Sequence, residues 1–541
     1  MIGGRGLMAR FDRREFLGAS IASIAAALSS GAVASTSGAI ARSRGPIAGA
    51  SGRPELDDPD QPRSVPGRFE PTVESLLTYQ TPEWFRDAKF GIWAHWGPQA
   101  VPRQGDWYAR LMYVPGHPDY DYHVKTYGHP STFGYKDVIP LWTADKFDPD
   151  ALMAKYAAAG AKYFVSMGVH HDNFDLWNSR HHRWNAAAMG PKRDIVGAWK
   201  AAAKRRGLRF GVSEHLGASY CWWYPNHLYD QFGPKLGIGY DGADPHYFDL
   251  YHDNRDQPFR NTPDSWYTSN SNYHRMWYRR IRDLVDSYQP DLLYSDGGLP
   301  FGAIGRALVA DLYNSSIARS GKLEAVYNCK DSGTGEFHRE WGVQDVERGV
   351  LKGINPLPWQ TDTSNGDWFF NENYSYKTTD EVVTMLADIV SKNGNLLLNV
   401  VLHADGSLPP ESEQLLAELT AWMAVNAQAI HGTRPWKIDG EGPTEAAVGM
   451  FKEKVAYTAR DIRFTTKGDR LFAMTLGQPA GSVAITSLAT GNPHERRSVR
   501  HVRLLGHRGA TTFRQTGQAL VIDVPATLPT RHASVFEVTF A

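Results

Sequence analysis

A carboxylate at the end of a short apolar run is the first candidate for chemistry in this chain. The run QPDLLYSDGG extends from Gln289 to Gly298, and Asp296 precedes its two closing glycines. An aspartate at a strand end suits glycoside hydrolysis, in which one carboxylate attacks the sugar and a second one protonates the leaving oxygen. Because Asp before Gly is also common in turns, Asp296 could instead serve only the backbone. The side chains at other strand ends favour the catalytic interpretation.

Several other apolar runs of the chain also end on polar side chains. In chain order they end on His95, on His170 and His171, on Glu214 and His215, on Asn328, and on Asn399. Reactive side chains at the C-terminal ends of many parallel strands are typical of the catalytic face of a (β/α)8 barrel. Histidines in such positions could hold the hydroxyl groups of a sugar beside the attacking carboxylate.

The consecutive residues His170, His171 and Asp172 also suggest a metal site. Adjacent residues on an extended segment point to opposite faces, so neighbouring histidines rarely bind one ion together. The sequence contains neither of the spacings HxH and HExxH. We therefore expect no metal and no other cofactor, and a metal-dependent hydrolase stays a minor alternative.

Helix signals alternate with these apolar runs. Asp148 is placed as the N-cap of the segment FDPDALMAKYAAAG, Asp194 opens a second helix, and Thr378 and Glu381 have the spacing of a capping box before a third. Alternating helices and strands indicate a parallel sheet that is covered on both faces. A barrel is favoured over an open sheet because the reactive side chains come from so many different strand ends.

The pattern changes after the predicted helix Glu411 to Ile430. From about His431 onward, short alternating runs such as RLFAMTLG and ALVIDVP are separated by Gly, Asn and Pro, which is typical of an antiparallel β-sandwich. We therefore predict an α/β chain with a (β/α)8-like TIM barrel over residues 76–430, followed by a C-terminal β-sandwich domain over residues 431–541.

The N-terminus has the composition of a targeting segment. Arg13 and Arg14 stand in DRREFLG before a mild Ser/Ala-rich apolar stretch, which predicts a twin-arginine signal peptide over residues 1–41. The apolar stretch is too short to span a bilayer stably. Residues 42–75 are rich in Pro, Gly, Ser and charge, and we expect a flexible linker there. The expected location is periplasmic or extracellular.

Composition excludes some classes of partner. The chain has 58 basic and 58 acidic residues, so neither a nucleic-acid surface nor a membrane surface is indicated. Its aromatic content is high, with 17 Trp, 25 Tyr and 23 Phe, which suits both core packing and sugar stacking. Two cysteines, Cys221 and Cys329, cannot form a disulfide framework, and we favour two free thiols over one bridge.

Several sequence blocks resemble the α-L-fucosidases of glycoside hydrolase family 29, from about Pro82 to the C-terminus. They are HWGPQAVPRQGDWY, AGAKYFVSMGVHHDNFDLW, RDIVGAWKAAAKRRGLRFGV, PDLLYSDGG and NAQAIHGTRPWK. The resemblance implies a (β/α)8-like barrel, a C-terminal β-sandwich, no metal, and a retaining two-step mechanism with a covalent fucosyl-enzyme.

The resemblance also implies roles for individual residues. Asp296 matches the nucleophile of the family. The residues that match the fucose-binding pocket are His95, Trp107, Tyr108, His170, His171 and Tyr294. The chain departs from the family pattern at Ser213, Glu214 and His215, at Asn173 in place of a glycine, and over residues 326–349. Glu214 and His215, held at a strand end, are expected to hydrogen bond to the substrate.

The acid/base residue is expected on a variable loop. Glu347 in QDVERG falls about where the resemblance places the acid/base glutamate, and Glu340 and Glu336 are alternatives. Glu347 could instead only form a salt bridge with Arg348. The distance from Asp296 to the correct glutamate should be ~5–5.5 Å in a retaining enzyme and ~6.5–9.5 Å in an inverting one.

The function that the resemblance implies is an exported, retaining exo-α-L-fucosidase. Its partner would be a fucosylated oligosaccharide or glycoconjugate, hydrolysed at terminal α-L-fucosyl linkages. Two alternatives stay open beside the metal-dependent hydrolase. One is an exo-glycosidase for a related sugar such as α-L-galactose, and the other is a catalytically inactive fucose-binding relative.

Overall fold

The computed structural model describes residues 63–256 and 265–541. The expected twin-arginine signal over residues 1–41, with Arg13 and Arg14, lies outside the described residues, as does most of the expected linker. In the described part of the chain, no helix has the length and apolar character that are needed to cross a membrane.

Eight parallel strands form a closed barrel, and each strand pairs with its neighbours in chain order. The strands are β1 (Phe90–Ala94), β2 (Tyr163–Val169), β3 (Arg209–Glu214), β4 (Leu292–Ser295), β5 (Val326–Lys330), β6 (Val343–Asp345), β7 (Trp359–Ser364) and β8 (Gly394–Asn399). Pairing of β1 with both β2 and β8 closes the ring. The predicted (β/α)8-like barrel is confirmed.

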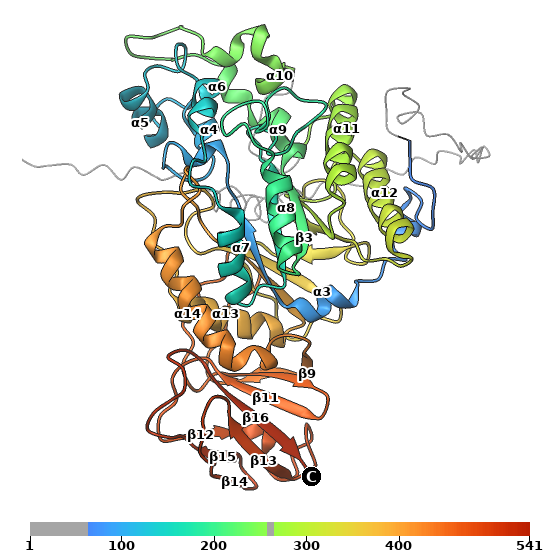
Figure 1. The fold of residues 1–541 in the computed structure, drawn as a ribbon, viewed down its shortest axis with the longest axis vertical. Helices are drawn as coiled ribbons and strands as arrows, with labels where there is room; N and C mark the ends of the chain where they lie inside the picture. Colours follow the sequence, from blue (N-terminus) through green and yellow to red (C-terminus); the bar gives the residue numbers. More distant parts are fainter. Residues whose placement is uncertain (1–62, 257–264) are drawn as a thin grey trace, which may run out of the picture.

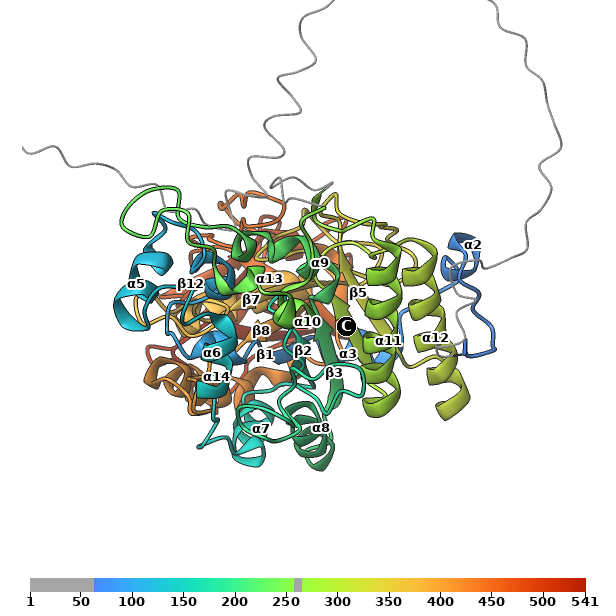
Figure 2. The same ribbon diagram turned by 90° about the horizontal axis from the view of Figure 1, so that it is seen from above.

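Long helices cover the outside of the barrel (Figure 2). They are α7 (Pro149–Ala158), α8 (Ile195–Arg205), α11 (Ser271–Tyr288), α12 (Ala303–Ser320), α13 (Thr379–Ser391) and α14 (Pro410–Asn426). Asp148 caps α7, Asp194 caps α8, and Thr378 and Glu381 form the expected capping box of α13. No helix separates β5, β6 and β7, all of whose connecting residues are described. The barrel wall is therefore irregular where the segment after β6 carries Glu347.

Shorter helices lie before β1 and in the loops that follow the strands. They are α2 (Val73–Leu76), α3 (Glu83–Ala88), α4 (Tyr108–Leu111), α5 (Pro118–Thr126), α6 (Tyr135–Val138), α9 (Leu216–Trp222) and α10 (Phe248–Tyr251). Figure 1 shows α4, α5, α6, α9 and α10 together at one end of the barrel, and the C-terminal strands at the opposite end. The long loops after β1 and β3 therefore cover the end at which the functional side chains emerge.

The folded part begins inside the region that composition predicts to be a linker. The backbone N–H of Val65 donates to Asp311 Oδ1 on α12 at 2.7 Å, and that of Phe69 donates to Asn314 Oδ1 at 2.9 Å. The ring of Tyr79 stacks on the ring of Tyr313 at 4.8 Å between centroids. Residues from 65 onward are thus packed on the barrel because α12 offers polar partners for an extended chain.

The C-terminal domain contains two antiparallel sheets. The five-stranded sheet has the order β13 (Val499–Leu504), β16 (Ser534–Phe540), β11 (Arg470–Thr475), β10 (Ile462–Lys467), β9 (Arg434–Glu441). The three-stranded sheet has the order β12 (Ser482–Ile485), β15 (Leu520–Asp523), β14 (Phe513–Gln515). Phe464 and Phe536 of the first sheet share one buried core with Val483 and Ile522 of the second. This arrangement is the predicted β-sandwich.

The two domains share buried contacts. Phe472 and Met474 of β11 belong to the core of the barrel domain rather than to the core of the sandwich. Arg463 on β10 donates from Nε to Asp388 Oδ1 on α13 at 2.6 Å, and both side chains are buried. Cys221 and Cys329 are free and buried, as favoured from the sequence, and burial raises the pKa of each thiol to about 12.

Candidate active site

Asp296 lies one residue beyond β4, at a turn that requires the glycines that follow it. Gly297 has a φ of +116°, and a Cβ there would lie 2.5 Å from the hydroxyl oxygen of Tyr267. A Cβ on Gly298 would lie 2.0 Å from the carbonyl oxygen of Thr334. Only glycine therefore fits at these two positions, and Asp296 stands directly before them at the end of β4.

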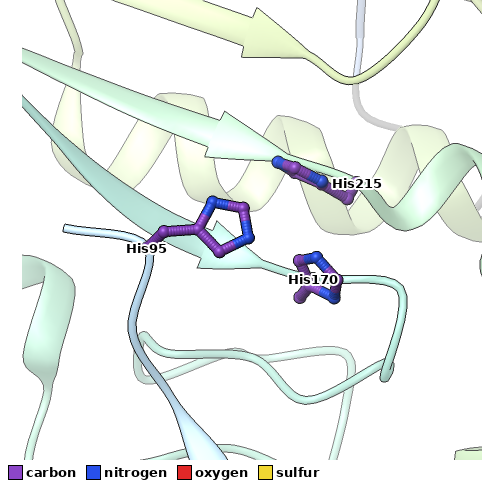
Figure 3. A group of neighbouring side chains, drawn as sticks. All are labelled: His95, His170 and His215. Carbon is purple, nitrogen blue, oxygen red and sulfur yellow. The ribbon is translucent and has the colours of Figure 1, made fainter. Parts of the chain in front are cut away.

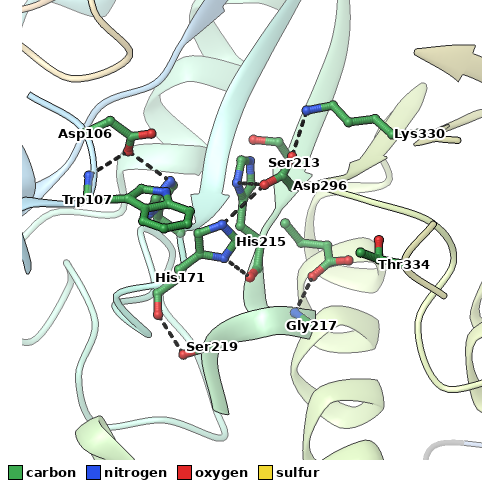
Figure 4. A network of polar contacts seen from close by, with 12 residues as sticks. Asp106, Trp107, His171, Ser213, His215, Gly217, Ser219, Asp296, Lys330 and Thr334 are labelled. Carbon is green, nitrogen blue, oxygen red and sulfur yellow. Dashed lines mark hydrogen bonds and ion pairs between the residues drawn. The ribbon is translucent and has the colours of Figure 1, made fainter. Parts of the chain in front are cut away.

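The carboxylate of Asp296 faces three nitrogen-bearing side chains (Figure 4). Lys330 donates from Nζ to Oδ1 at 2.7 Å. His171 Nε2 and His215 Nδ1 lie 3.2 and 3.3 Å from Oδ2. Nearby cations and hydrogen-bond donors favour the ionised form of a carboxylate, which is the form that a nucleophile needs.

The tautomer of His171 follows from its other ring nitrogen. His171 Nδ1 lies 2.7 Å from the backbone carbonyl of His215, which can only accept, so Nδ1 carries a proton. A neutral His171 then has no proton on Nε2 to give to Asp296. A hydrogen bond between His171 Nε2 and Asp296 Oδ2 would need a proton on one of these two atoms.

Lys330 at the end of β5 bridges Asp296 to a second carboxylate. Its Nζ lies 2.6 Å from Glu347 Oε2 and 3.6 Å from Asp362 Oδ2. Glu347 lies two residues beyond β6 and is fully buried. Of the alternatives from sequence, Glu336 binds Arg306 at 2.5 Å, and Glu340 is exposed. The geometry thus brings Glu347 into the same ion-pair network as Asp296.

Three histidines from neighbouring strands form a cluster beside this network (Figure 3). His95, His170 and His215 follow β1, β2 and β3, and their ring centroids lie 4.8–5.2 Å apart. Burial lowers the pKa of His170 well below its usual value, and the neighbouring histidines lower it further. His170 is therefore neutral at ordinary pH and serves as a hydrogen-bonding group rather than as a charge.

The orientation of His170 is set by Gln99 and Asp106. Gln99 accepts from the N–H of Ala109 at 3.3 Å, so its amide nitrogen faces His170 Nδ1, 2.9 Å away. The proton of His170 then resides on Nε2, which lies 3.5 Å from Asp106 Oδ1. This chain of contacts fixes which ring nitrogen of His170 donates.

The same histidines are spaced so that they could hold a metal ion. His95, His170 and His215 offer ligand atoms within 4.8 Å of one another, as do His171, His215 and Asp296. In the sequence, only His170 and His171 are adjacent to each other at one strand end. These clusters arise from different strands, which sequence spacing does not show.

Aromatic side chains line the same region. The ring of Trp107 lies 6.2 Å from that of His171 and stacks on Trp266 at 6.0 Å. On another side, Trp368 and Phe369 lie 5.2 and 4.9 Å from the ring of His95. Together they supply apolar surface next to the hydrogen-bonding histidines.

Two of the expected pocket aromatics have their hydroxyl groups bound elsewhere. Tyr108 is fully buried, and its hydroxyl lies 2.6 Å from His123 Nδ1. Tyr294 donates to Asp362 Oδ2 at 3.0 Å, and its ring packs against Trp93. The hydroxyl of Tyr294 is therefore bound to Asp362 of the ion-pair network. The hydroxyl of Tyr108 is bound to His123 in the loop region after β1.

Glu214 has a carboxylate whose hydrogen bonds fasten β3 to its surroundings. It accepts from Ser295 Oγ at 2.6 Å, from Trp277 Nε1 at 3.0 Å and from the N–H of Gly217 at 3.3 Å. Burial raises the pKa of Glu214, and these donors oppose that effect. The contacts give Glu214 a structural role beside Asp296, whose N–H donates to the Glu214 carbonyl at 3.2 Å.

Asn173 occupies a backbone position that few residue types tolerate. Its φ is +63°, a left-handed conformation that Gly and Asn tolerate best. The side-chain amide donates to the carbonyls of Asp249 and Leu250, and its oxygen accepts from Arg280 at 2.6 Å. The asparagine thus adds contacts to α10 that a glycine could not make.

Sequence reasoning missed Lys330, Asp362 and Asp106 as parts of the site. Lys330 ends β5, so the strand-end rule that found the histidines could have found it, whereas Asp362 lies inside β7 and is not marked by that rule. Their partners Asp296 and Glu347 come from other strands, and no spacing in the sequence announces those contacts. Asp106 lies in a loop and carries no such signal.

Comparison with known proteins gives consistent results. A family model described as Alpha-L-fucosidase matches residues 60–428. The chain is 31% identical to the plasma alpha-L-fucosidase of Pongo abelii, over 79% of this chain and 86% of the relative, and 30% identical to that of Homo sapiens, over 79% and 85%. A solved structure of the Thermotoga maritima alpha-fucosidase in complex with fucose aligns with a TM-score of 0.67 at 28% identity, covering 87% of this chain and 100% of that one.

Proposed function

The chain belongs to the α-L-fucosidase family of glycoside hydrolases, and from this premise we propose that it cleaves terminal α-L-fucosyl linkages by a retaining two-step mechanism. Asp296 would be the nucleophile and Glu347 the acid/base residue. The substrate would be a fucosylated oligosaccharide or glycoconjugate. A similar protein, the Thermotoga maritima enzyme, has been solved with fucose, which supports the choice of sugar.

One observation carries the mechanistic part of the proposal. Lys330 Nζ lies 2.7 Å from Asp296 Oδ1 and 2.6 Å from Glu347 Oε2, so these two oxygens are at most about 5.3 Å apart. This upper bound is compatible with the ~5–5.5 Å of a retaining pair and lies below the ~6.5–9.5 Å of an inverting pair. An inverting enzyme needs room for a water molecule between the sugar and its base. The short bound on this oxygen pair therefore supports a retaining pair over an inverting one.

The chemistry can be written with these residues. In the first step Asp296 attacks the anomeric carbon, the glycosidic bond breaks, and Glu347 gives its proton to the leaving oxygen. In the second step Glu347 takes a proton from water, the water attacks the anomeric carbon, and Asp296 leaves as a carboxylate. Lys330 would stabilise the carboxylate of Asp296 before attack and after release.

The surroundings of Asp296 suit a deoxy sugar. His95, His170, His171 and His215 offer donors and acceptors for hydroxyl groups, and Trp368 and Phe369 offer an apolar wall for a methyl group. A wall of this kind favours fucose over α-L-galactose, which carries a hydroxyl in place of that methyl hydrogen. Equal turnover of aryl α-L-galactosides and α-L-fucosides would contradict the choice of fucose.

The decisive experiment follows the anomeric configuration of the product. We expect NMR of a fresh digest of an aryl α-L-fucoside to show α-L-fucose first, because two inversions give net retention. Asp296→Ala should lose turnover while keeping fucose binding, and azide should restore turnover of an activated fucoside by Glu347→Ala. Release of β-L-fucose as the first product would overturn the retaining mechanism.

We also propose that the protein is exported through its twin-arginine segment. The supporting observation is the pair Arg13 and Arg14 before a weak apolar stretch. Replacing both arginines with lysine should leave the enzyme in the cytoplasmic fraction of the producing cell. Unchanged export of that variant would contradict the proposal.

A further inference from the structure

A loop of the C-terminal domain extends from the sandwich to the barrel. It connects β9 to β10, and we refer to residues 444–458 as the 444–458 loop. Its base is closed by Asp461, whose carboxylate accepts four hydrogen bonds of 2.7–2.9 Å from the backbone N–H and hydroxyl groups of Thr444 and Thr458. The loop is therefore held at its base rather than attached by a free chain.

The 444–458 loop pairs with the segment that carries Glu347. Four backbone hydrogen bonds of 2.8–3.2 Å join the two, between Gly449 and Val350 in both directions, from Phe451 to Glu347, and from Glu453 to Arg348. The last residue of β5, Lys330, pairs with the last residue of β6, Asp345. The residues after Asp345 therefore have no neighbour in β5. The C-terminal domain thus takes over as the neighbour of the segment that follows β6.

The other edge of this segment is held by β7. Val346 and Arg348 donate their N–H groups to the carbonyls of Gln360 and Asp362 at 2.9 and 2.8 Å. Alternate residues of an extended chain face opposite edges, so Glu347 has its carbonyl towards the 444–458 loop. The backbone of Glu347 is therefore fixed from both sides, by the barrel and by the C-terminal domain.

Glu453 adds a buried ionic contact to this pairing. Its side chain is 6% exposed and binds Arg348 at 3.2 Å, Lys377 at 2.9 Å and Thr363 Oγ1 at 2.5 Å. A buried carboxylate is costly unless it is paired in this way. Arg348 in turn has a φ of +44° and lies over the ring of Trp368, 4.9 Å from its centroid.

We propose that Glu453 is a positioning residue for Glu347, an inference that rests on the proposed acid/base role of Glu347. Glu453 holds Arg348 away from Glu347 and fixes the segment on which Glu347 stands. Without it, the guanidinium of Arg348 competes with Lys330 for the Glu347 carboxylate. A general acid must lie within hydrogen-bond reach of the leaving oxygen, and a misplacement of about 1 Å can cost ~10²-fold in rate.

The test uses the full-length enzyme and a series of aryl α-L-fucosides whose leaving groups range from dinitrophenol to phenol. For Glu453→Ala and the milder Glu453→Gln, kcat/KM for the phenyl fucoside should fall ~10- to 100-fold, whereas the dinitrophenyl fucoside, which needs no protonation, should change less than about 3-fold. A residue with a purely structural role would lower kcat/KM for all members of the series by one factor.

Glu537→Gln is the matched control. Glu537 is a buried carboxylate of the same domain that binds Arg503 at 2.8 Å and lies in the sandwich sheet. It should lower the melting temperature without changing the dependence on the leaving group. Glu347→Gln belongs in the same series and should show the steepest dependence.

The outcomes separate the two proposals. A steep series for Glu347→Gln with flat series for both Glu453 variants would overturn the positioning role alone. A flat series for Glu347→Gln would overturn the acid/base assignment, and the positioning role with it. If Glu453→Ala does not fold, Glu453→Gln decides, since it keeps the shape of the side chain.

Discussion

The ammonium group of Lys330 is surrounded by carboxylates. Asp296 and Glu347 lie within 2.7 Å of its Nζ, and Asp362 lies at 3.6 Å. Burial raises the pKa of the nearby Asp345 well above its usual value, and the charge of Asp362 raises it further. The ammonium and the carboxylates around it lie close enough to act on one another's charge. The pH dependence of this site therefore belongs to the network and not to single residues.

Removal of the Lys330 ammonium tests whether this cation controls the pH dependence of the site. In Lys330→Met, Asp296 and Glu347 face each other without the shared ammonium, and the protonated form of the nucleophile is favoured. We expect kcat/KM at pH 7 to fall ~10²-fold or more, and the acid limb of its pH profile to move to higher pH.

Lys330→Arg is the matched variant for that measurement. It keeps the charge but not the compact geometry of the ammonium, so it should lose less activity and keep the wild-type position of the acid limb. An acid limb that stays in place in Lys330→Met would show that the cation does not control the ionisation of Asp296.

The turn that follows β2 holds several site residues and is itself held by Asn173. The turn after β2 carries His170, His171 and Asp172, and then reverses at Asn173 with a positive φ. From there the side chain of Asn173 reaches α10 and Arg280. The turn that carries the site histidines is thus fastened to α10 and α11 by the side chain of Asn173.

The two functions of Asn173 can be separated by substitution. Asn173→Gly keeps the left-handed backbone and loses the side-chain bonds, whereas Asn173→Ala loses the bonds and adds strain. We expect chemical denaturation to show Asn173→Ala as the less stable of the two by about 1–2 kcal/mol.

Both Asn173 variants should raise KM through the neighbouring histidines. The control is Asn393→Gly, since Asn393 also has a positive φ but lies directly before β8, at the other end of the barrel. It should leave KM unchanged. Equal stability of Asn173→Ala and Asn173→Gly would contradict the strain argument.

At the scale of the whole molecule, the C-terminal domain is part of the folded unit of the barrel. Trp422 on α14 donates to the carbonyl of Ala533 at 2.9 Å, and Phe472 and Met474 enter the core of the barrel. The buried pair of Arg463 and Asp388 lies between the domains, where Lys392 also binds Asp388 at 2.8 Å. This part of the junction lies at α13 and α14, away from the end that carries Asp296, whereas the 444–458 loop forms a separate contact that reaches Glu347.

The buried pair at the junction should matter for stability and not for chemistry. Arg463→Met leaves Asp388 with Lys392, and Asp388→Asn leaves two buried cations, so each should cost about 3–5 kcal/mol of unfolding free energy, with the larger loss for Asp388→Asn. The double variant should recover part of that loss in a double-mutant cycle.

The kcat/KM of these junction variants at moderate temperature should equal that of the wild type. Thermal unfolding followed by activity and by fluorescence is the measurement. If the single losses were additive in the double variant, Arg463 and Asp388 would not be coupled. A fall in kcat/KM without a fall in stability would show that the junction acts on the site.

Local patterns in the sequence predict the type of barrel and most of the strand-end residues at its functional edge. Apolar runs that end on His95, His170, His215 and Asp296 indicate parallel strands because such runs can only be buried on both faces, and helix caps such as Asp148 are local signals. The sandwich was also predictable, since the alternation of apolar and polar residues is a property of the chain, whereas the count of two cysteines only favoured free thiols over one bridge. The resemblance to a known family placed Glu347 among three candidate glutamates.

Only the tertiary structure decided which of these side chains meet. Lys330 at the end of β5 binds both Asp296, which follows β4, and Glu347, which follows β6. The carboxylate of Glu214 accepts hydrogen bonds from Ser295 and Trp277. The 444–458 loop reaches Glu347 from the C-terminal domain. Contacts of this kind depend on the closure of the barrel and on the docking of the sandwich. Local sequence patterns indicate where a strand lies and whether it is buried. They do not indicate which distant side chain forms the ion pair or hydrogen bond with a buried charged group.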